Sequence, residues 1–231
     1  MLRLLSFFLV VLVLSSVVQH LPIIGPIFRG LHFIGFWLIA IGLAWALTRL
    51  GEKAILRKRD ASEIRRLQAV DTPHNRGKLG SLLLGQGQAR KSLAHFEAAV
   101  AGEPEVVEWA YRLGCAHLNV GQPEEAVEAL QRVCELDEEY AYGAAQMLLA
   151  VALSKTGRYE EALEVLKEQQ RNHGPSPENA YRRGMAYKRL GHRTEARLCF
   201  DEVGSLAHEA ARYKKREAGN WAVRARLASM F

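Results

Sequence analysis

The chain has 231 residues with a formal net charge of +6, and 49% of its residues are hydrophobic. This length allows one or two domains with a sizeable core. Residues 1–59 hold seven basic side chains against one acidic side chain, so the rest of the chain carries no net charge. Because the excess charge lies beside apolar segments rather than along a folded domain, we expect no nucleic-acid partner.

The motifs that usually carry chemistry are missing from the sequence. It contains no HExxH, GxSxG, phosphate-binding loop or glycine-rich dinucleotide fingerprint. The three cysteines, Cys115, Cys134 and Cys199, form no CxxC and have no metal-ligand spacing, so we interpret them as small buried side chains. We therefore predict a protein that is not an enzyme, with no catalytic residue, no cofactor and no metal.

Two apolar stretches open the chain. Residues 4–18 carry no charge, and a second stretch covers residues 31–47, which would span roughly 26 Å as a helix, close to a thin hydrocarbon core. Pro22 and Pro26 between them suit a turn. We predict a transmembrane region over residues 1–50, as a two-helix hairpin; the alternatives are a signal peptide followed by an anchor, or one membrane helix with an interfacial partner.

Basic side chains follow the second apolar stretch. Seven stand within about twenty positions, a clustering that favours the cytoplasmic side: Arg49, Lys53, Arg57, Lys58, Arg59, Arg65 and Arg66. We expect residues 1–59 to contact membrane lipid and residues 51–71 to form a basic juxtamembrane helix or linker. The predicted location is the inner cell membrane, multi-pass, with the following domain facing the cytoplasm.

A pattern then recurs four times between residues 72 and 205. Four glycines are spaced by 34, 36 and 34 residues: Gly87, Gly121, Gly157 and Gly191. Five positions after each stands a small residue, and four positions later a large apolar one: Ser92 and Phe96, Ala126 and Leu130, Ala162 and Leu166, Ala196 and Phe200. This period predicts stacked helix–turn–helix units. Thr72-Pro73 and Ser176-Pro177 supply helix starts.

At these residues the chain resembles the tetratricopeptide repeat (TPR) family. The matching positions are Leu79, Gly80, Gly87, Phe96, Ala99 and Pro104 in repeat one; Leu113, Gly114, Gly121, Ala126 and Leu130 in repeat two; Leu149, Gly157, Ala162 and Leu166 in repeat three; and Gly184, Tyr187, Gly191, Ala196 and Phe200 in repeat four. The family tryptophan is absent from all four registers. The resemblance implies an all-α helical-repeat solenoid of about four repeats, here combined with the N-terminal transmembrane region.

The resemblance also implies a concave groove lined by the first helix of each repeat. Carried over position by position, the candidate partner-binding residues are Glu108, Tyr111, Cys115, Asn119, Met147, Lys155, Tyr181, Met185, Lys188 and Arg189. Tyrosines, methionines and cations suit a peptide with apolar and acidic residues. An ordinary mixed surface is the alternative interpretation. Chaperone-binding relatives use a clamp of Lys and Asn side chains to hold the C-terminal carboxylate of their partner. This clamp is not met here, because Tyr111 and Cys115 occupy its positions.

Residues 206–231 show a helical pattern and are predicted to be a capping helix, interrupted at Gly219-Asn220. Its basic cluster could instead contact lipid or an acidic partner. Charge is segregated along the repeats: residues 103–168 hold fourteen acids and five bases, whereas residues 169–231 hold six acids and thirteen bases. A homo-oligomer through head-to-tail contacts is therefore possible.

Together these features predict a membrane-anchored TPR scaffold or adaptor. It would bind a protein or peptide partner in its groove at the cytoplasmic membrane face. Two alternatives stay open. One is a permanent structural subunit of a membrane transport or assembly complex, and the other is an envelope-side chaperone if the orientation is reversed.

Overall fold

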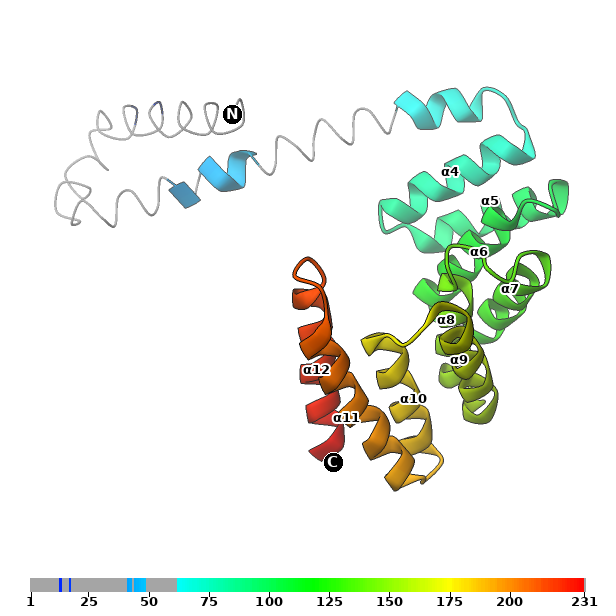
Figure 1. The fold of residues 1–231 in the computed structure, drawn as a ribbon. Helices are drawn as coiled ribbons and strands as arrows, with labels where there is room; N and C mark the ends of the chain where they lie inside the picture. Colours follow the sequence, from blue (N-terminus) through cyan, green and yellow to red (C-terminus); the bar gives the residue numbers. More distant parts are fainter. Residues whose placement is uncertain (1–12, 14–16, 18–40, 43, 49–61, 231) are drawn as a thin grey trace. The chain divides into compact units, whose positions relative to one another are not determined.

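The computed structural model describes residues 13, 17, 41–42, 44–48 and 62–230 (Figure 1). The chain divides into two compact units, residues 1–66 and residues 67–231. Among the described residues, no helix is both long enough and apolar enough to cross a membrane. The predicted spans at residues 4–18 and 31–47 lie largely outside the described residues, as does most of the 51–71 linker. The hairpin, the anchor and the orientation therefore stay predictions.

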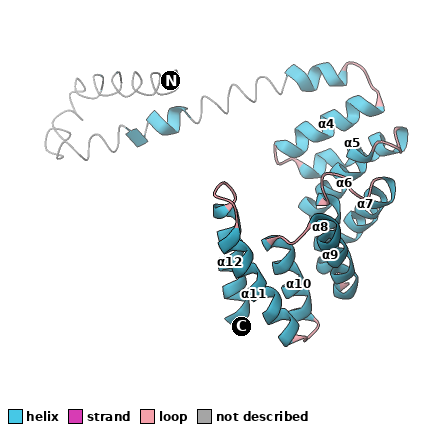
Figure 2. Cartoon of the chain, in the orientation of Figure 1, coloured by secondary structure: helices cyan, strands magenta, loops and turns pink. Residues whose placement is uncertain are grey.

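The second unit is built from helices and connecting turns (Figure 2). Residues 62–68 are helical, and nine further helices follow within residues 73–230. They are α4 (Pro73–Gly85), α5 (Ala89–Gly102), α6 (Val107–Val120), α7 (Pro123–Leu136), α8 (Ala144–Lys155), α9 (Tyr159–His173), α10 (Pro177–Arg189), α11 (Arg193–Glu209) and α12 (Lys215–Met230). Four helix pairs, α4–α5 to α10–α11, correspond to the four predicted repeats.

The predicted helix starts and turns are confirmed. The Thr72 and Ser176 hydroxyls accept backbone N–H hydrogen bonds from Asn75 and Asn179, each at 3.2 Å, and a proline follows each cap. Between the helices of repeat two, Gly121 has a φ of +85°, a left-handed conformation that glycine adopts without the steric cost of a side chain.

The pair of helices in a repeat approaches closely because a glycine of the first helix faces a large side chain of the second. The pairs are Gly80 with Phe96, Gly114 with Leu130, and Gly184 with Phe200. A Cβ at Gly114 would stand 2.6 Å from Leu130 Cγ, so even a methyl group has no room there. Repeat three has Ala150 at this position, 1% exposed. The small and large residues of the sequence pattern are therefore packing residues.

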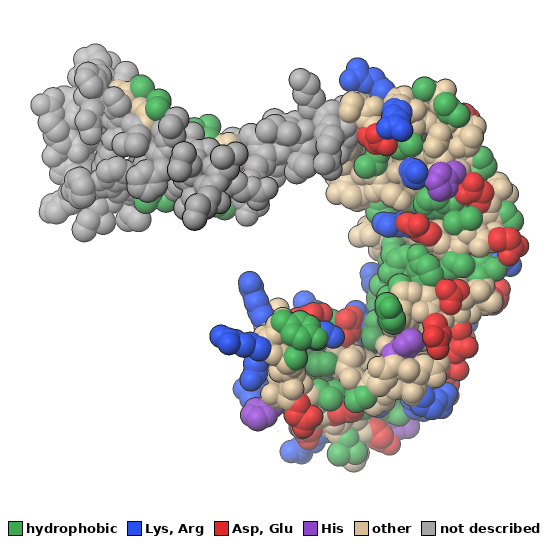
Figure 3. Space-filling model, turned by 45° about the horizontal axis from the view of Figure 1, so that its top comes forward, with side chains coloured by type: hydrophobic (Ala, Val, Ile, Leu, Met, Phe, Trp, Pro, Cys, Tyr) green, Lys and Arg blue, Asp and Glu red, His purple; other side chains and the backbone are tan. Residues whose placement is uncertain are grey.

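The two kinds of helix occupy different sides of the array. The first helices of successive repeats contact one another, from α4–α6 through α6–α8 and α8–α10 to α10–α12. Within the described part of the chain, consecutive second helices make no comparable contact. The array therefore curves with α4, α6, α8 and α10 on its inner side, and Figure 3 shows hydrophobic side chains reaching the inner wall of this curve.

The C-terminal segment differs from the sequence prediction. Helix α11 continues to Glu209, a turn follows, and α12 then runs from Lys215 to Met230 without a break. The predicted interruption at Gly219-Asn220 is wrong, because one glycine inside a helix costs only about 1 kcal/mol and packing offsets it. Helix α12 packs on α10 and α11 as a capping helix.

Candidate functional site

The candidate residues of α6 form a polar and aromatic surface. The Tyr111 ring contacts the Tyr140 ring at a tilt of 55°, with centroids 5.2 Å apart. The Asn119 side chain donates to the Cys115 carbonyl oxygen at 2.8 Å. Burial raises the pKa of both the Tyr111 phenol and the Cys115 thiol. Both groups are thus neutral at pH 7, which suits contact and hydrogen bonding rather than nucleophilic chemistry.

The α8 candidates lie beside the main core cluster. Met147 is half-buried and packs, together with Tyr111, against a cluster that includes Leu130, Leu149 and Leu153. Lys155 is the last residue of α8 and is exposed. The surface of α8 therefore offers a deformable thioether on a rigid base, with a cation near the end of the helix.

The α10 candidates are partly covered by α12. Tyr181 and Met185 pack in a cluster with Trp221 and Ala228 of α12. The Lys188 ammonium donates to the Ala228 carbonyl oxygen at 2.6 Å. Of the four α10 candidates, Arg189 is exposed and the other three are half-buried. Sequence reasoning therefore placed these residues on the correct helix, but it did not anticipate that α12 contacts Tyr181 and Lys188.

The charged candidates fall into two groups. Glu108 pairs with Arg112 at 3.1 Å, and Glu178 at the equivalent position of α10 pairs with Arg182, so each acid is neutralised by its own helix. Lys155 and Arg189 stand at equivalent positions near the ends of α8 and α10. Across the described residues, no carboxylate lies within ion-pair distance of either cation. The inner face is therefore left with uncompensated positive charge.

Sequence reasoning missed the contribution of α12 to this face. The Trp221 ring lies under two guanidinium groups, Arg224 at 4.6 Å and Arg182 at 5.6 Å from its centroid. A signal was available in the spacing of small residues. Ala218 and Ala225 are buried seven residues apart, as are Ala145 and Ala152 on α8, so α12 takes the place of a first helix.

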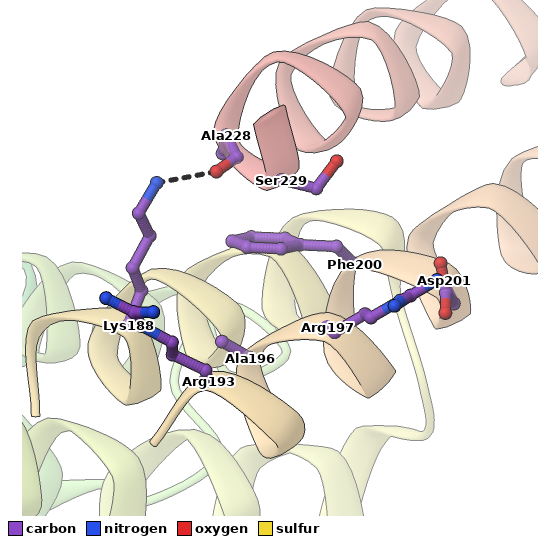
Figure 4. A pocket seen from close by; sticks show the side chains of 8 residues that line it. All are labelled: Lys188, Arg193, Ala196, Arg197, Phe200, Asp201, Ala228 and Ser229. Carbon is purple, nitrogen blue, oxygen red and sulfur yellow. Dashed lines mark hydrogen bonds between the residues drawn. The ribbon is translucent and has the colours of Figure 1, made fainter. Parts of the chain in front are cut away.

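A pocket of about 730 Å³ lies between α10, α11 and the end of α12 (Figure 4). Its walls include Lys188, Arg193, Arg197 and Phe200, and Figure 4 shows Lys188 directed at the Ala228 carbonyl. Cations at the carboxyl end of a helix stabilise the partial negative charge of its free carbonyl groups. The Lys188 ammonium thus has a structural role in holding α12.

The helix pairs of residues 73–209 and their inner face together define an α-helical repeat protein that presents a curved surface. Two overlapping segments, residues 78–141 and 111–177, match the tetratricopeptide repeat family. These segments are therefore tetratricopeptide repeats, and the protein contains a TPR-type solenoid.

Solved structures agree on the fold. The MamA protein superimposes with a TM-score of 0.62 at 22% identity, covering 71% of this chain and 91% of MamA. YrrB, described as a TPR protein with an unusual peptide-binding site, gives a TM-score of 0.63 at 19% identity, covering 78% of this chain and 87% of YrrB. At these identities the similarity shows the fold alone.

Two curated relatives match part of the chain. Both are DnaJ homolog subfamily C member 3, from Gallus gallus with 29% identity over 85 residues and from Rattus norvegicus with 35% identity over 91 residues. The matches cover 37% and 39% of this chain, but only 16% and 18% of the relatives. The chain thus spans less than a fifth of their length.

Proposed function

We propose that the inner face of the repeats binds an acidic, partly apolar peptide segment of a partner protein, and that the protein acts as a scaffold. The observation that carries this proposal is the unequal pairing of charge. The acids on this face, Glu108 and Glu178, have arginine partners, whereas Lys155 and Arg189 have no acidic partner among the described residues. A peptide carboxylate would supply the missing counter-charge.

The apolar part of the surface supports the same partner chemistry. Tyr111 and Met147 are half-buried on neighbouring helices, and they offer an aromatic ring and a flexible thioether to an apolar side chain. YrrB, which shares this fold, is described as having a peptide-binding site. The absence of the Lys/Asn clamp argues against a partner held by its terminal carboxylate.

Selection from a random peptide library displayed against the full-length chain tests this proposal. Enriched peptides should combine Asp or Glu with apolar residues, and a photoreactive group in them should label α6, α8 or α10. Enrichment of basic peptides, or labelling confined to the outer helices α7 and α9, would contradict it.

We further propose that residues 1–50 anchor the scaffold at the inner face of a cell membrane. The support is sequence-based: two apolar stretches followed by seven basic side chains. A reporter active only outside the cytoplasm, fused after Phe231, tests the orientation. Activity of that reporter would exclude the cytoplasmic location and favour an envelope-side chaperone.

A further inference from the structure

The exposed surface of α12 occupies a special position in the repeat register. Four helices carry two buried side chains seven residues apart: Trp109 and Ala116 on α6, Ala145 and Ala152 on α8, Asn179 and Ala186 on α10, and Ala218 and Ala225 on α12. These residues face the preceding repeat, since Asn179 contacts α9 and Ala225 packs with Phe200 and Val203 of α11. The four helices can therefore be aligned on these pairs.

The alignment identifies the side of α12 that a second helix would cover. Five positions after the first buried residue stand Gly114, Ala150 and Gly184, and the first and last of these lie directly against Leu130 of α7 and Phe200 of α11. The equivalent residue of α12 is Val223, which is 60% exposed. No helix in residues 62–230 covers this side of α12.

This uncovered side is apolar with a cation at its centre. We define the outer face of α12 as Val223, Arg226, Leu227 and Met230, which share one side because they are spaced by three and four residues. Leu227 is 55% exposed and Met230 is 74% exposed. Arg226 is exposed between them and has no ion-pair partner among the described residues. The turn before α12 adds Arg212 and Lys214, and α12 begins with Lys215 and Arg216, against the single acid Glu217.

We propose that the outer face of α12 is a docking site for an acidic amphipathic helix of a partner protein, seated where a second helix packs in the complete repeats. The apolar side chains would pack against its apolar stripe, and a carboxylate would pair with Arg226. This site is separate from the groove of the proposed function and does not depend on it.

Charge disfavours the other occupants. Pairing the same face of a second copy about a twofold axis would bring the two Arg226 side chains together. The N-terminal segment is unsuitable because residues 1–59 are strongly basic. A bilayer would have to accommodate Arg226 in the middle of the buried stripe, which is costly. An acidic helix satisfies both the apolar residues and the cation.

Two synthetic peptides of about five helical turns test the site on the full-length chain. Both carry leucines at helical i, i+3, i+4 and i+7 spacing, one flanked by glutamates and the other by lysines. The glutamate peptide should bind at least about tenfold more tightly by fluorescence anisotropy, and hydrogen exchange should slow across residues 215–230. Equal affinity for the two peptides would overturn the proposal.

Variants locate the binding. Arg226→Glu should make the chain bind the lysine peptide more tightly than the glutamate peptide. Leu227→Ser should weaken binding of the glutamate peptide about tenfold. Leu198→Ser is the matched control, because Leu198 is 64% exposed on α11. Lys155→Ala with Arg189→Ala tests the groove separately and should leave the peptide-induced slowing of hydrogen exchange across residues 215–230 unchanged. Loss of binding in the groove variant alone would assign the peptide to the groove and overturn the α12 site.

Two further measurements separate the rival occupants. The first measures hydrogen exchange across α12 without any peptide. The exchange should be equally fast when the full-length chain is in phosphatidylserine-rich nanodiscs and when it is in phosphatidylcholine nanodiscs. Protection that Arg226→Glu abolishes would assign the face to lipid instead. Light scattering measures whether the chain self-associates. Self-association that Leu227→Ser abolishes would assign the outer face of α12 to a second copy.

Discussion

The aromatic rings of Tyr181 on α10 and Trp221 on α12 lie 5.4 Å apart, measured between their centroids. Tyr181 also contacts Phe200 of α11, with a centroid separation of 6.1 Å. These contacts join the last complete repeat to the capping helix, so α12 belongs to the packed array rather than to a loose tail. They also place α12 beside the candidate groove residues of α10.

Truncating Trp221 should therefore loosen α12. Trp221→Ala removes a half-buried ring and its contact with Tyr181, and we expect the free energy of unfolding to fall by about 2–3 kcal/mol. Urea denaturation gives the change, and hydrogen exchange across residues 215–230 should accelerate. Tyr213→Ala is the control, because Tyr213 is 83% exposed and should change stability by less than about 0.5 kcal/mol. Equal effects of the two variants would refute this role of Trp221.

The interface between repeats three and four depends on a buried amide. Asn179 is fully buried, and its Nδ2 donates to the Leu166 carbonyl oxygen and to Gln169 Oε1, each at 2.7 Å. Its Oδ1 accepts from Arg183 Nε at 2.9 Å. Asn179→Ala removes these three hydrogen bonds from a buried site and should cost about 2–3 kcal/mol of unfolding free energy in urea denaturation.

Asn172→Ala serves as the comparison for that experiment. Asn172 is exposed on α9 and donates to Glu138 Oε1 at 3.0 Å, where water can replace the lost bond. We expect a loss below about 0.5 kcal/mol. A small effect at both positions would show that the Asn179 network does not stabilise the interface.

Two glycines should respond oppositely to the same substitution. A Cβ at Gly184 would stand 2.6 Å from Phe200 Cε1, whereas a Cβ at Gly204 on α11 meets nothing within 4 Å. Gly184→Ala should destabilise the chain by about 1–3 kcal/mol through overpacking. Gly204→Ala should stabilise it by about 0.5–1 kcal/mol through helix propensity. Thermal unfolding of both variants, followed by circular dichroism, measures the signs, and a stabilising Gly184→Ala would contradict the packing described here.

The pH dependence of stability should report on Cys134. Burial raises its thiol pKa to about 11 from an ordinary value of 9.0, and the nearby carboxylates Glu138, Glu168 and Glu135 act in the same direction. Because the folded pKa is the higher one, the stability contribution is complete below about pH 9 and is lost as pH rises toward about 11. Cys134→Ala should flatten this part of the stability curve. An unchanged slope would show that the thiol does not titrate as described.

Much of the repeat fold was predictable because its rules are local. The proline-containing caps at Thr72 and Ser176 and the turn glycine Gly121 follow from backbone chemistry, and the structure confirms them. The close packing of Gly184 on Phe200 follows from the spacing of small and large residues. Local signals were misleading at Gly219, where contacts between α12 and its neighbours maintain the helix.

The candidate site was less predictable because it depends on contacts between distant residues. Sequence register placed Tyr181 and Lys188 on an inner helix, but only the packing of α12 shows that Trp221 and Ala228 contact them. The pairing of Glu108 with Arg112 follows from helical spacing, whereas the lack of a carboxylate near Arg189 required the structure. Whether these residues bind a partner stays a prediction.

The most direct test of the groove is the affinity of a library-selected acidic peptide for charge-reversed protein. Lys155→Glu combined with Arg189→Glu should weaken binding of the peptide at least about tenfold, because it reverses two inner-face cations that have no acidic partner among the described residues. Arg132→Glu combined with Arg171→Glu changes the net charge equally at exposed positions of α7 and α9 and should leave the affinity within about twofold of the unmodified protein. Equal weakening by both pairs, or none by the first, would contradict peptide binding at the inner face.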